Sequence, residues 1–343
     1  MTRPERGQGR TDRVLLMQLD GKLPNLALMR IAHWHRSRGD VVEYRRAGNS
    51  RAACPRFGDS FDRVYASAIF ERTRPLAGLV ERQWPGAVLG GTGWDMARTL
   101  GDVGIPPDGP VDYSDWPRWT SSIGFTQRGC RLRCPFCVVP RKEGAMQAKG
   151  AVAEIWRGDP WPRHVLLLDN DFFGQPQWRD RIDELRGGGF RVSFNQGINA
   201  RFLTDETAAA IASVDYRADD MRERRIYTAW DSRKDEKRLF RGLDLLVKHG
   251  VRPRHIMVYM LIGYWTGETE GDREHRRARL REFGALPYPM PYRRTPELLG
   301  FQRWVIGGYD KQIPWDEWRR ARCNPRKLTR RGSSQCHLPV VTA

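Results

Sequence analysis

The sequence predicts an α/β protein in two parts: a small parallel sheet covered by helices, followed by a partial barrel of β/α units. Three observations lead to this fold class. Strand-like and helix-like stretches alternate over residues 13–93, and they alternate again over residues 120–292. A stretch rich in Pro, Gly and Asp, residues 101–119, separates the two series and is typical of a linker.

Length and composition are consistent with two folded domains. The chain has 343 residues, of which 40% are hydrophobic, enough for a sizeable core. A domain usually takes about 100–200 residues. We therefore predict a first domain with its linker over residues 1–112, a barrel domain over residues 113–310, and a basic C-terminal tail over residues 311–343.

The first series has the order expected of a parallel sheet with helices on both faces. Its first strand, "RVLLMQL", is a continuous apolar run, as in a strand buried on both sides. The first helix has Pro24 near its start and Gly39 as its stop. The predicted strands are 13–19, 40–46, 62–70 and 87–93, and the predicted helices are 24–39 and 71–86.

The second series contains six strand candidates with helical patterns between most of them. Several of these helices end in glycine, the usual C-terminal stop. Six β/α units favour a partial barrel, in which functional loops follow the carboxyl ends of the strands. The strands are predicted at 120–126, 164–171, 190–197, 224–231, 255–264 and 285–292, and the helices at 177–189, 204–214, 235–250 and 268–284.

The charge of the chain leaves two interpretations open. The formal net charge is +18, with a pI near 10.2. This charge either attracts a nucleic acid or another polyanion, or it reflects an arginine-rich composition spread over solvated surface. Basic residues concentrate most in "EWRRARCNPRKLTRRGSSQ", residues 317–335, where we expect a flexible tail.

The sequence predicts a cytoplasmic protein. No apolar run approaches the roughly 18–20 residues of a membrane span, and the basic N-terminus lacks the apolar core of a signal peptide. In a reducing compartment, clustered cysteines indicate metal or redox chemistry rather than disulfides.

Three of the six cysteines lie within eight residues, directly after the first predicted barrel strand. Their spacing is Cys130-x3-Cys134-x2-Cys137. Structural zinc takes four ligands, commonly as two Cys-x2-Cys pairs, and no histidine lies nearby in the sequence. A cluster of four irons normally takes four cysteines, so three would leave one iron open to another ligand. The missing fourth cysteine would then be the functional feature.

This loop, with Phe136 just before the last cysteine, resembles the signature of the radical S-adenosylmethionine superfamily. The wider context "RGCRLRCPFCVVPRKEG" is especially similar to the branch with methylthiotransferases and enzymes with cobalamin-binding domains. The resemblance implies a Rossmann-like N-terminal domain and a partial (β/α)6 TIM-like barrel. It also implies a 4Fe–4S cluster that cleaves S-adenosylmethionine to methionine and a 5′-deoxyadenosyl radical for hydrogen abstraction. A reductase such as flavodoxin or ferredoxin would supply the electron.

The resemblance also implies roles for residues at the ends of the later strands. Phe136 and Gly263 would lie near the adenine of S-adenosylmethionine. Asn195, Gln196 and Arg201 would contact its ribose or carboxylate, although the same stretch could be a plain exit from the strand. The Gly-Gly-Glu that the family carries after its second strand is absent. The polar residues that end this strand, Asp169, Asn170 and Asp171, would have to supply those contacts.

Three aspects of function stay open at this stage. Cobalamin is an alternative cofactor. The pattern Asp-x-His-x-x-Gly, which usually supplies the lower ligand of cobalamin, is absent, and the two candidate histidines, His33 and His35, lie inside a helical pattern. Trp230, Asp231, Tyr259 and Tyr264 could face a substrate or belong to a core or lid. The alternatives to hydrogen abstraction are a cobalamin-dependent radical methyltransferase and a non-catalytic nucleic-acid-binding protein with a structural zinc loop. A nucleic acid or nucleotide is the substrate class that the positive charge favours.

Overall fold

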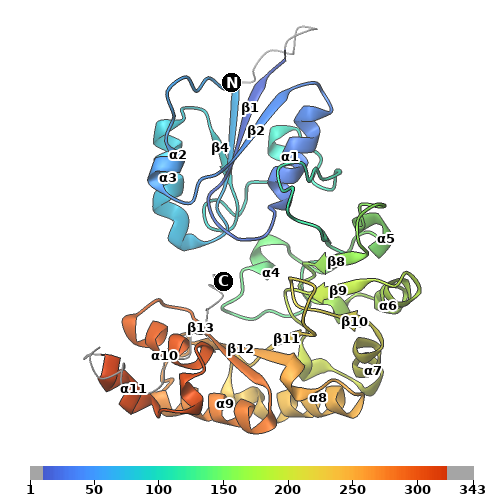
Figure 1. Cartoon of the computed structure of the whole chain (residues 1–343), viewed down its shortest axis with the longest axis vertical. Helices are drawn as coiled ribbons and strands as arrows, with labels where there is room; N and C mark the ends of the chain where they lie inside the picture. Colours follow the sequence, from blue (N-terminus) through green and yellow to red (C-terminus); the bar gives the residue numbers. More distant parts are fainter. Residues whose placement is uncertain (1–10, 323–343) are drawn as a thin grey trace. The chain divides into compact units, whose positions relative to one another are not determined.

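The computed structural model describes residues 11–322, which fall into two compact units divided between Thr120 and Ser121 (Figure 1). The sequence placed the boundary after residue 112, within the same stretch of loops. Both units are α/β with parallel sheets, as predicted. Among the described helices, none combines the length and the apolar character that a bilayer crossing requires.

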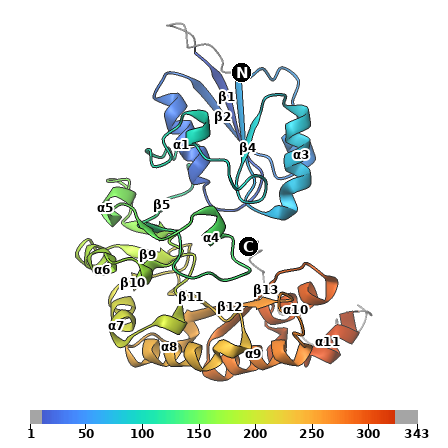
Figure 2. The same ribbon diagram turned by 180° about the vertical axis from the view of Figure 1, so that it is seen from behind.

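The first unit is one parallel sheet with the strand order β2-β1-β3-β4. Helix α1 lies on one side of this sheet and α3 on the other (Figure 2), and α2 lies beside α3 (Figure 1). All four predicted strands and both predicted helices are confirmed, and the short helix α2 is additional. The elements are β1 Arg13–Gln18, α1 Leu26–Arg36, β2 Val41–Arg46, α2 Ser50–Ala53, β3 Arg63–Ser67, α3 Arg74–Gln83 and β4 Val88–Gly90.

Strand β1 is apolar throughout because both of its faces are covered. Leu15 and Met17 belong to the same core cluster as Ala77 and Val80 of α3. The residues between them point to the opposite face, since side chains alternate along a strand. Val14 is fully buried as well.

The second unit has two parallel sheets, ordered β10-β9-β8-β5 and β11-β12-β13, and an antiparallel hairpin of β6 and β7. All six predicted strands of this half are confirmed. The strands are β5 Ser122–Gly124, β6 Gln127–Arg128, β7 Gln147–Ala148, β8 His164–Leu167, β9 Arg191–Phe194, β10 Asp215–Tyr216, β11 Ile226–Ala229, β12 Ile256–Ile262 and β13 Leu286–Pro291. The helices are α4 Val139–Lys142, α5 Val152–Ile155, α6 Trp178–Gly187, α7 Asp205–Ser213, α8 Glu236–Lys248, α9 Glu270–Phe283, α10 Pro296–Ile306 and α11 Trp315–Arg322.

The expected six-stranded barrel is not one continuous hydrogen-bonded sheet. The short strand β10 pairs with the first residues of β9, Arg191 and Val192. Beyond that point, one backbone hydrogen bond among residues 11–322 links the two sheets, from the N–H of Ile198 to the carbonyl of Tyr227 at 2.8 Å. The α/β class is therefore established, whereas the partial barrel stays a prediction.

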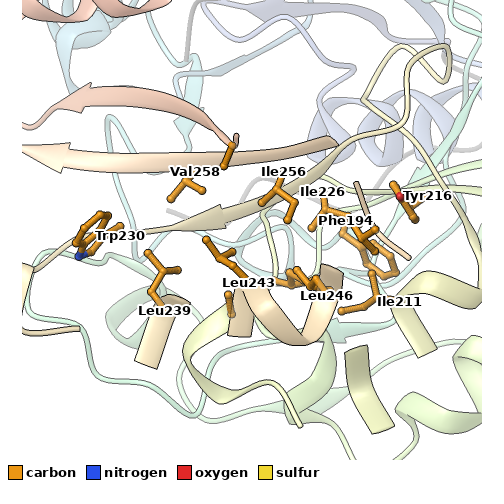
Figure 3. Packing of buried hydrophobic residues seen from close by; sticks show 14 of the residues in the cluster. Phe194, Ile211, Tyr216, Ile226, Trp230, Leu239, Leu243, Leu246, Ile256 and Val258 are labelled. Atoms are coloured by element: carbon orange, nitrogen blue, oxygen red, sulfur yellow. The ribbon is translucent and has the colours of Figure 1, made fainter. Parts of the chain in front are cut away.

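The core of the second unit lies between the sheets and the helices that follow their strands. Leu239, Leu243 and Leu246 of α8 pack against residues of β11 and β12 (Figure 3). Every second residue of β12, from Ile256 to Ile262, joins this core, and the residues between them are only partly buried. Burying one such leucine contributes about 1.5–3 kcal/mol. Trp230, directly after β11, is fully buried in the same core rather than exposed to a ligand.

The start of the predicted tail is folded. Residues 315–322 form α11, and Trp315 and Trp318 of this helix are buried in the core of the second unit. Trp315 contacts Phe301 and Trp304 of α10, with ring centroids 5.3 and 5.6 Å away. The charges of residues 317–335 predict a flexible tail, whereas the two tryptophans, three residues apart, form the apolar face of a helix. Residues 323–343 of the predicted tail lie outside the described residues.

Replacing Trp315 by alanine should destabilise the second unit by about 3–5 kcal/mol, since the substitution leaves a cavity among aromatic rings. Urea-induced unfolding measures this change. The control is Arg320→Ala, because Arg320 is exposed and bonds only to the carbonyl of Asp316 in its own helix. This control should change stability by less than about 0.5 kcal/mol. Equal stability of the two variants would contradict the anchoring of α11.

Candidate metal and cofactor site

The candidate site lies on the loops that follow the parallel strands of the second unit. Because β5, β8 and β9 run in the same direction, the segments that follow them leave the sheet at one edge. The loop after β5 carries the three cysteines, and the segment after β8 carries Asp169, Asn170 and Asp171. The loops after β11, β12 and β13 leave the second sheet in the same way.

The hairpin of β6 and β7 closes the cysteine loop at its base. Gln127 pairs with Ala148 and Arg128 with Gln147, so that residues 129–146 form the excursion between the two strands. Next to this pairing, the N–H of Lys149 donates to the carbonyl of Thr126 at 2.8 Å. The position of the loop is therefore set by backbone hydrogen bonds on both of its ends.

Asp169 fixes this hairpin to the end of β8. Its buried carboxylate accepts hydrogen bonds from the backbone N–H groups of Thr126 at 2.8 Å and Gln127 at 3.2 Å, and from the Thr126 hydroxyl. Burial raises the pKa of Asp169 to about 7, although these donors favour the charged form. In the structure the Asp169 carboxylate anchors the hairpin, and its predicted contact with a cofactor stays a prediction.

Gln127 shapes the turn that leads to the first cysteine. Its amide nitrogen donates to the carbonyls of Arg128 at 2.7 Å and Gly129 at 2.6 Å, and its amide oxygen accepts from the N–H of Asp171 at 3.0 Å. The side chain is fully buried. Gly129 itself has φ of +74°, and a Cβ there would lie 2.3 Å from the carbonyl oxygen of Ala145. Only glycine fits this close approach.

Glu143 ties the far end of the loop back to its start, and sequence reasoning missed it. Its carboxylate accepts from the Arg128 guanidinium at 2.9 Å, the N–H of Gly129 at 3.0 Å and the Asn170 amide at 2.7 Å. Burial acts to raise the pKa of Glu143, but the hydrogen bonds from Arg128 and Gly129 prevail and lower it. The only signal in the sequence is that Glu143 is the one acid among the many basic residues of the loop.

The three cysteines are partly buried and reduced. The N–H of Cys137 donates to the carbonyl of Cys134 at 3.0 Å, and Cys130 Sγ accepts from the N–H of Leu132 at 3.3 Å. Burial raises the pKa of Cys130 and of Cys137, and the negative charges of neighbouring groups, including the other thiolates, add to the effect. Holding Cys130 and Cys137 as thiolates therefore requires positive charge from a metal or from nearby cations.

Two arginines provide such charge at the loop. The Arg131 guanidinium pairs with Asp171 at 2.9 Å, and burial raises the pKa of Asp171 against the opposing effect of Arg131. Arg201 lies within hydrogen-bonding reach of the Cys134 thiol, and it also donates to Asp235 at 2.7 Å. The structure thus brings the predicted residues Arg201 and Asp171 next to the cysteine loop.

Phe136 lies against the loop that follows β12. Its ring meets that of Tyr264 edge-on, with centroids 5.4 Å apart, and Trp265 lies at 6.3 Å. Tyr264 in turn contacts Tyr292, which follows β13, at 4.8 Å. The predicted pair of Phe136 and Gly263 is thereby brought together through Tyr264, the residue after Gly263.

Gly263 permits a tight turn supported by a buried ion pair. It has φ of +76°, and a Cβ there would lie 2.3 Å from Leu298 Cδ1. Its N–H donates at 2.6 Å to Glu268, which pairs with Arg276. The Arg276 guanidinium also donates to the carbonyls of Trp230 and Leu261, both at 2.9 Å. The ends of β11 and β12 are therefore held by one buried guanidinium.

The remaining predicted residues have separate roles. The Asn170 amide bonds to Glu143, as described above. Asn195 is partly buried and its side chain accepts from the exposed Gln196 amide at 3.2 Å. Asp231 lies close enough to Cys137 for its charge to raise the pKa of that thiol. Burial raises the pKa of Asp231 itself to about 6, against the opposing charges of Arg201 and Arg276. Tyr259 stacks on Tyr227 with centroids 5.7 Å apart, within the sheet rather than at its edge.

Residues 11–322 contain no group of three His, Cys, Asp or Glu side chains arranged around a point that one ion could fill. This finding concerns single ions, because a four-iron cluster is wider and spans thiols that lie further apart. In the chemistry of its donors, a loop with three thiols flanked by arginines fits an iron–sulfur cluster.

The histidines considered for cobalamin both lie in α1. His35 is buried, and its two ring nitrogens bond to Asp40 at 2.6 Å and to the Tyr65 hydroxyl at 3.1 Å. His33 is partly buried on the same helix. Since His35 is engaged on both nitrogens, it is a core residue of the first unit.

Gly129→Ala should open the cysteine loop, since the new Cβ displaces the carbonyl of Ala145. Gly144→Ala is the matched control: Gly144 has φ of +71° but open space around it, so the substitution costs only about 1–2 kcal/mol for the left-handed backbone. Trypsin, which cleaves after Arg131, Arg133 and Arg141, should cut Gly129→Ala markedly faster than either the control or the wild type. Equal cleavage rates for the two variants would show that the close approach does not restrain the loop.

Asp169→Asn should change how stability depends on pH. The pKa of Asp169 is raised from 3.8 to about 7 on folding, so the folded state binds the proton more tightly. The stabilisation from this proton is present below about pH 4 and is lost as pH rises to about 7. Asparagine cannot ionise, so the wild type should lose stability relative to the variant across this window, as measured by urea unfolding.

The exposed Asp205 provides a control of opposite sign for this measurement. Its pKa is lowered by hydrogen bonds from Lys248 and His249, so its contribution is lost as pH falls. The wild type should therefore gain stability relative to Asp205→Asn as pH rises. Parallel pH profiles for the wild type and Asp169→Asn would contradict the burial of an ionising carboxyl at position 169.

Comparison of the chain with models of protein families found no matching family, and comparison with curated proteins found no significant match. A function for this chain is therefore inferred from the residues of the site and from the pattern of its cysteines.

Proposed function

We propose that the chain is a radical S-adenosylmethionine enzyme, with Cys130, Cys134 and Cys137 as the ligands of a 4Fe–4S cluster. The observation that carries this proposal is the position of the three thiols. They occupy one anchored loop directly after β5, at the edge of the sheet where the parallel strands end. Loops at this edge carry the chemistry of barrel enzymes.

The finer fold that this function requires is also a proposal. The two sheets of the second unit would be the halves of a partial (β/α)6 barrel, joined where Ile198 bonds to Tyr227. The alternation of β12 supports this, since one of its faces packs on helices and the other is only partly buried. The first unit, with its parallel order β2-β1-β3-β4, would be the Rossmann-like domain.

The chain's own residues have defined tasks around such a cluster. When bound, a 4Fe–4S cluster supplies the electron that splits S-adenosylmethionine into methionine and a 5′-deoxyadenosyl radical, which abstracts a substrate hydrogen. The Arg201 guanidinium places positive charge beside Cys134, and the Arg131 guanidinium balances the charge of Asp171 beside Cys130. Asp169, Gln127 and Glu143 hold the ends of the cysteine loop by hydrogen bonds.

Aromatic residues offer a surface for the adenine of S-adenosylmethionine. Phe136 and Tyr264 lie in contact and belong to the cysteine loop and to the loop after β12. Flat rings favour stacking with a purine. Asn195 and Gln196 are candidates for its polar groups, and both end the neighbouring strand β9. The electron would come from a cytoplasmic reductase such as flavodoxin or ferredoxin.

Alanine at Cys130, Cys134 or Cys137 should abolish cluster binding. After anaerobic reconstitution with iron and sulfide, each variant should lose the visible cluster absorbance, and none should form 5′-deoxyadenosine with dithionite and S-adenosylmethionine. The matched control is Cys54→Ala, because Cys54 lies in the first unit and should leave the iron content unchanged.

Two outcomes of the same experiment would redirect the assignment. Full cluster absorbance in Cys134→Ala would refute the ligand set. Zinc in place of iron in the purified protein would support a structural loop of a nucleic-acid-binding protein. Adding cobalamin and analysing the products for S-adenosylhomocysteine would test the methyltransferase alternative.

A further inference from the structure

We infer that the loops around the cysteines form a surface that binds single-stranded nucleic acid, and that this polymer is the substrate of the site. The role of the polymer as a substrate rests on the proposed function. The binding surface is argued from its own residues alone. These residues lie on the cysteine loop and on the loops after β12 and β13 of the second unit. We call them the arginine-aromatic surface, consisting of Arg133, Arg141, Trp265, Tyr292, Arg293 and Arg294.

The cations of this surface have no partner within the described part of the protein. Arg133 and Arg141 are exposed on the cysteine loop, and Arg293 and Arg294 are exposed after β13. Most other arginines of the second unit are paired, as Arg131 is with Asp171. Four uncompensated guanidinium groups attract a chain of phosphates, whose oxygens match the fork of donors on each guanidinium.

Contacts among aromatic rings bring these loops together. Phe136 meets Tyr264, and Tyr264 meets Tyr292, with centroids 5.4 and 4.8 Å apart. The N–H of Tyr292 also donates to the carbonyl of Ile262 at 2.9 Å. The arginines near Phe136 and next to Tyr292 in the sequence therefore belong to loops that one group of rings joins.

Two rings in this group are open to solvent. Tyr292 is 51% exposed and Trp265 is 39% exposed. The Trp265 indole N–H donates to the carbonyl of Asp231 at 2.7 Å, which fixes the ring in place. Aromatic rings between cations are typical of proteins that bind single strands, where bases stack on the rings and the cations follow the backbone. Paired bases of a duplex cannot reach such rings, so the surface favours a single strand.

The first experiment measures binding of a short fluorescein-labelled single-stranded RNA by anisotropy over a range of salt concentrations. Two double variants, Arg133→Glu with Arg141→Glu and Arg293→Glu with Arg294→Glu, should each weaken binding roughly tenfold or more. Each should also flatten the slope of log K against log[salt] by roughly 0.7 for every phosphate that the variant no longer neutralises. The matched control is Arg252→Glu with Arg254→Glu, exposed residues that precede β12 at the opposite edge of the sheet.

A second variant separates stacking from charge. Trp265→Ala with Tyr292→Ala should weaken binding roughly fivefold or more while leaving the salt slope unchanged. All variants retain residues 323–343, so the basic residues there contribute equally to every measurement. Circular dichroism of each variant checks that it is folded.

Three results would overturn the inference. The control could weaken binding as much as the two arginine variants do, which would make the binding a matter of total charge. The aromatic variant could bind like the wild type, or polyglutamate could displace the RNA as well as unlabelled RNA does. Unchanged binding by the aromatic variant would show that no base stacks on these rings, and displacement by polyglutamate would assign the surface to an acidic protein such as an electron donor. Binding should persist in Cys134→Ala, so a failure of the radical chemistry and a failure of the surface are distinguishable.

Discussion

The buried carboxylate of Asp169 is the interaction on which the candidate site depends. It joins the end of β8 to the first residues after β5, and through them it sets where the cysteine loop begins. A buried carboxylate is costly unless donors surround it, and here two backbone N–H groups and a hydroxyl do so. Gln127 and Glu143 extend this polar network along both ends of the loop. The loop that carries the three thiols is positioned by this network, whereas the ends of β11 and β12 are held by Arg276.

The sequence was sufficient for the elements of the fold and for the edge of the sheet that carries the site. Apolar runs such as "HVLLL" predict buried strands because a strand covered on both faces has no polar side. The helices between them have clear starts and stops. The closure of the barrel was beyond reach, since it depends on how two sheets meet near Ile198, and no local pattern encodes that contact.

For the site, residue type predicts chemistry but not contacts. Three thiols at close spacing indicate a metal, and this metal stays a prediction. Asp169 has the same residue type and the same strand-end position as a cofactor ligand, yet its hydrogen bonds go to Thr126 and Gln127. Glu143 contacts groups that lie up to 27 residues away in the chain, which a sequence pattern cannot reveal. The charge around α11 predicts a tail, whereas its two tryptophans form a buried helix face.

The anchoring of the cysteine loop has a consequence for how the protein matures. The hydrogen bonds that fix the loop come from Thr126, Gln127, Gly129 and their partners, and none of them uses a thiol as the anchor. Under the proposed function, the loop would therefore reach its final shape before the cluster is inserted. In small zinc domains the metal drives folding, whereas here the binding loop would already be folded in the apoprotein. Under the proposed function, damage to the cofactor by oxygen would then leave a folded apoprotein that can be reloaded rather than degraded.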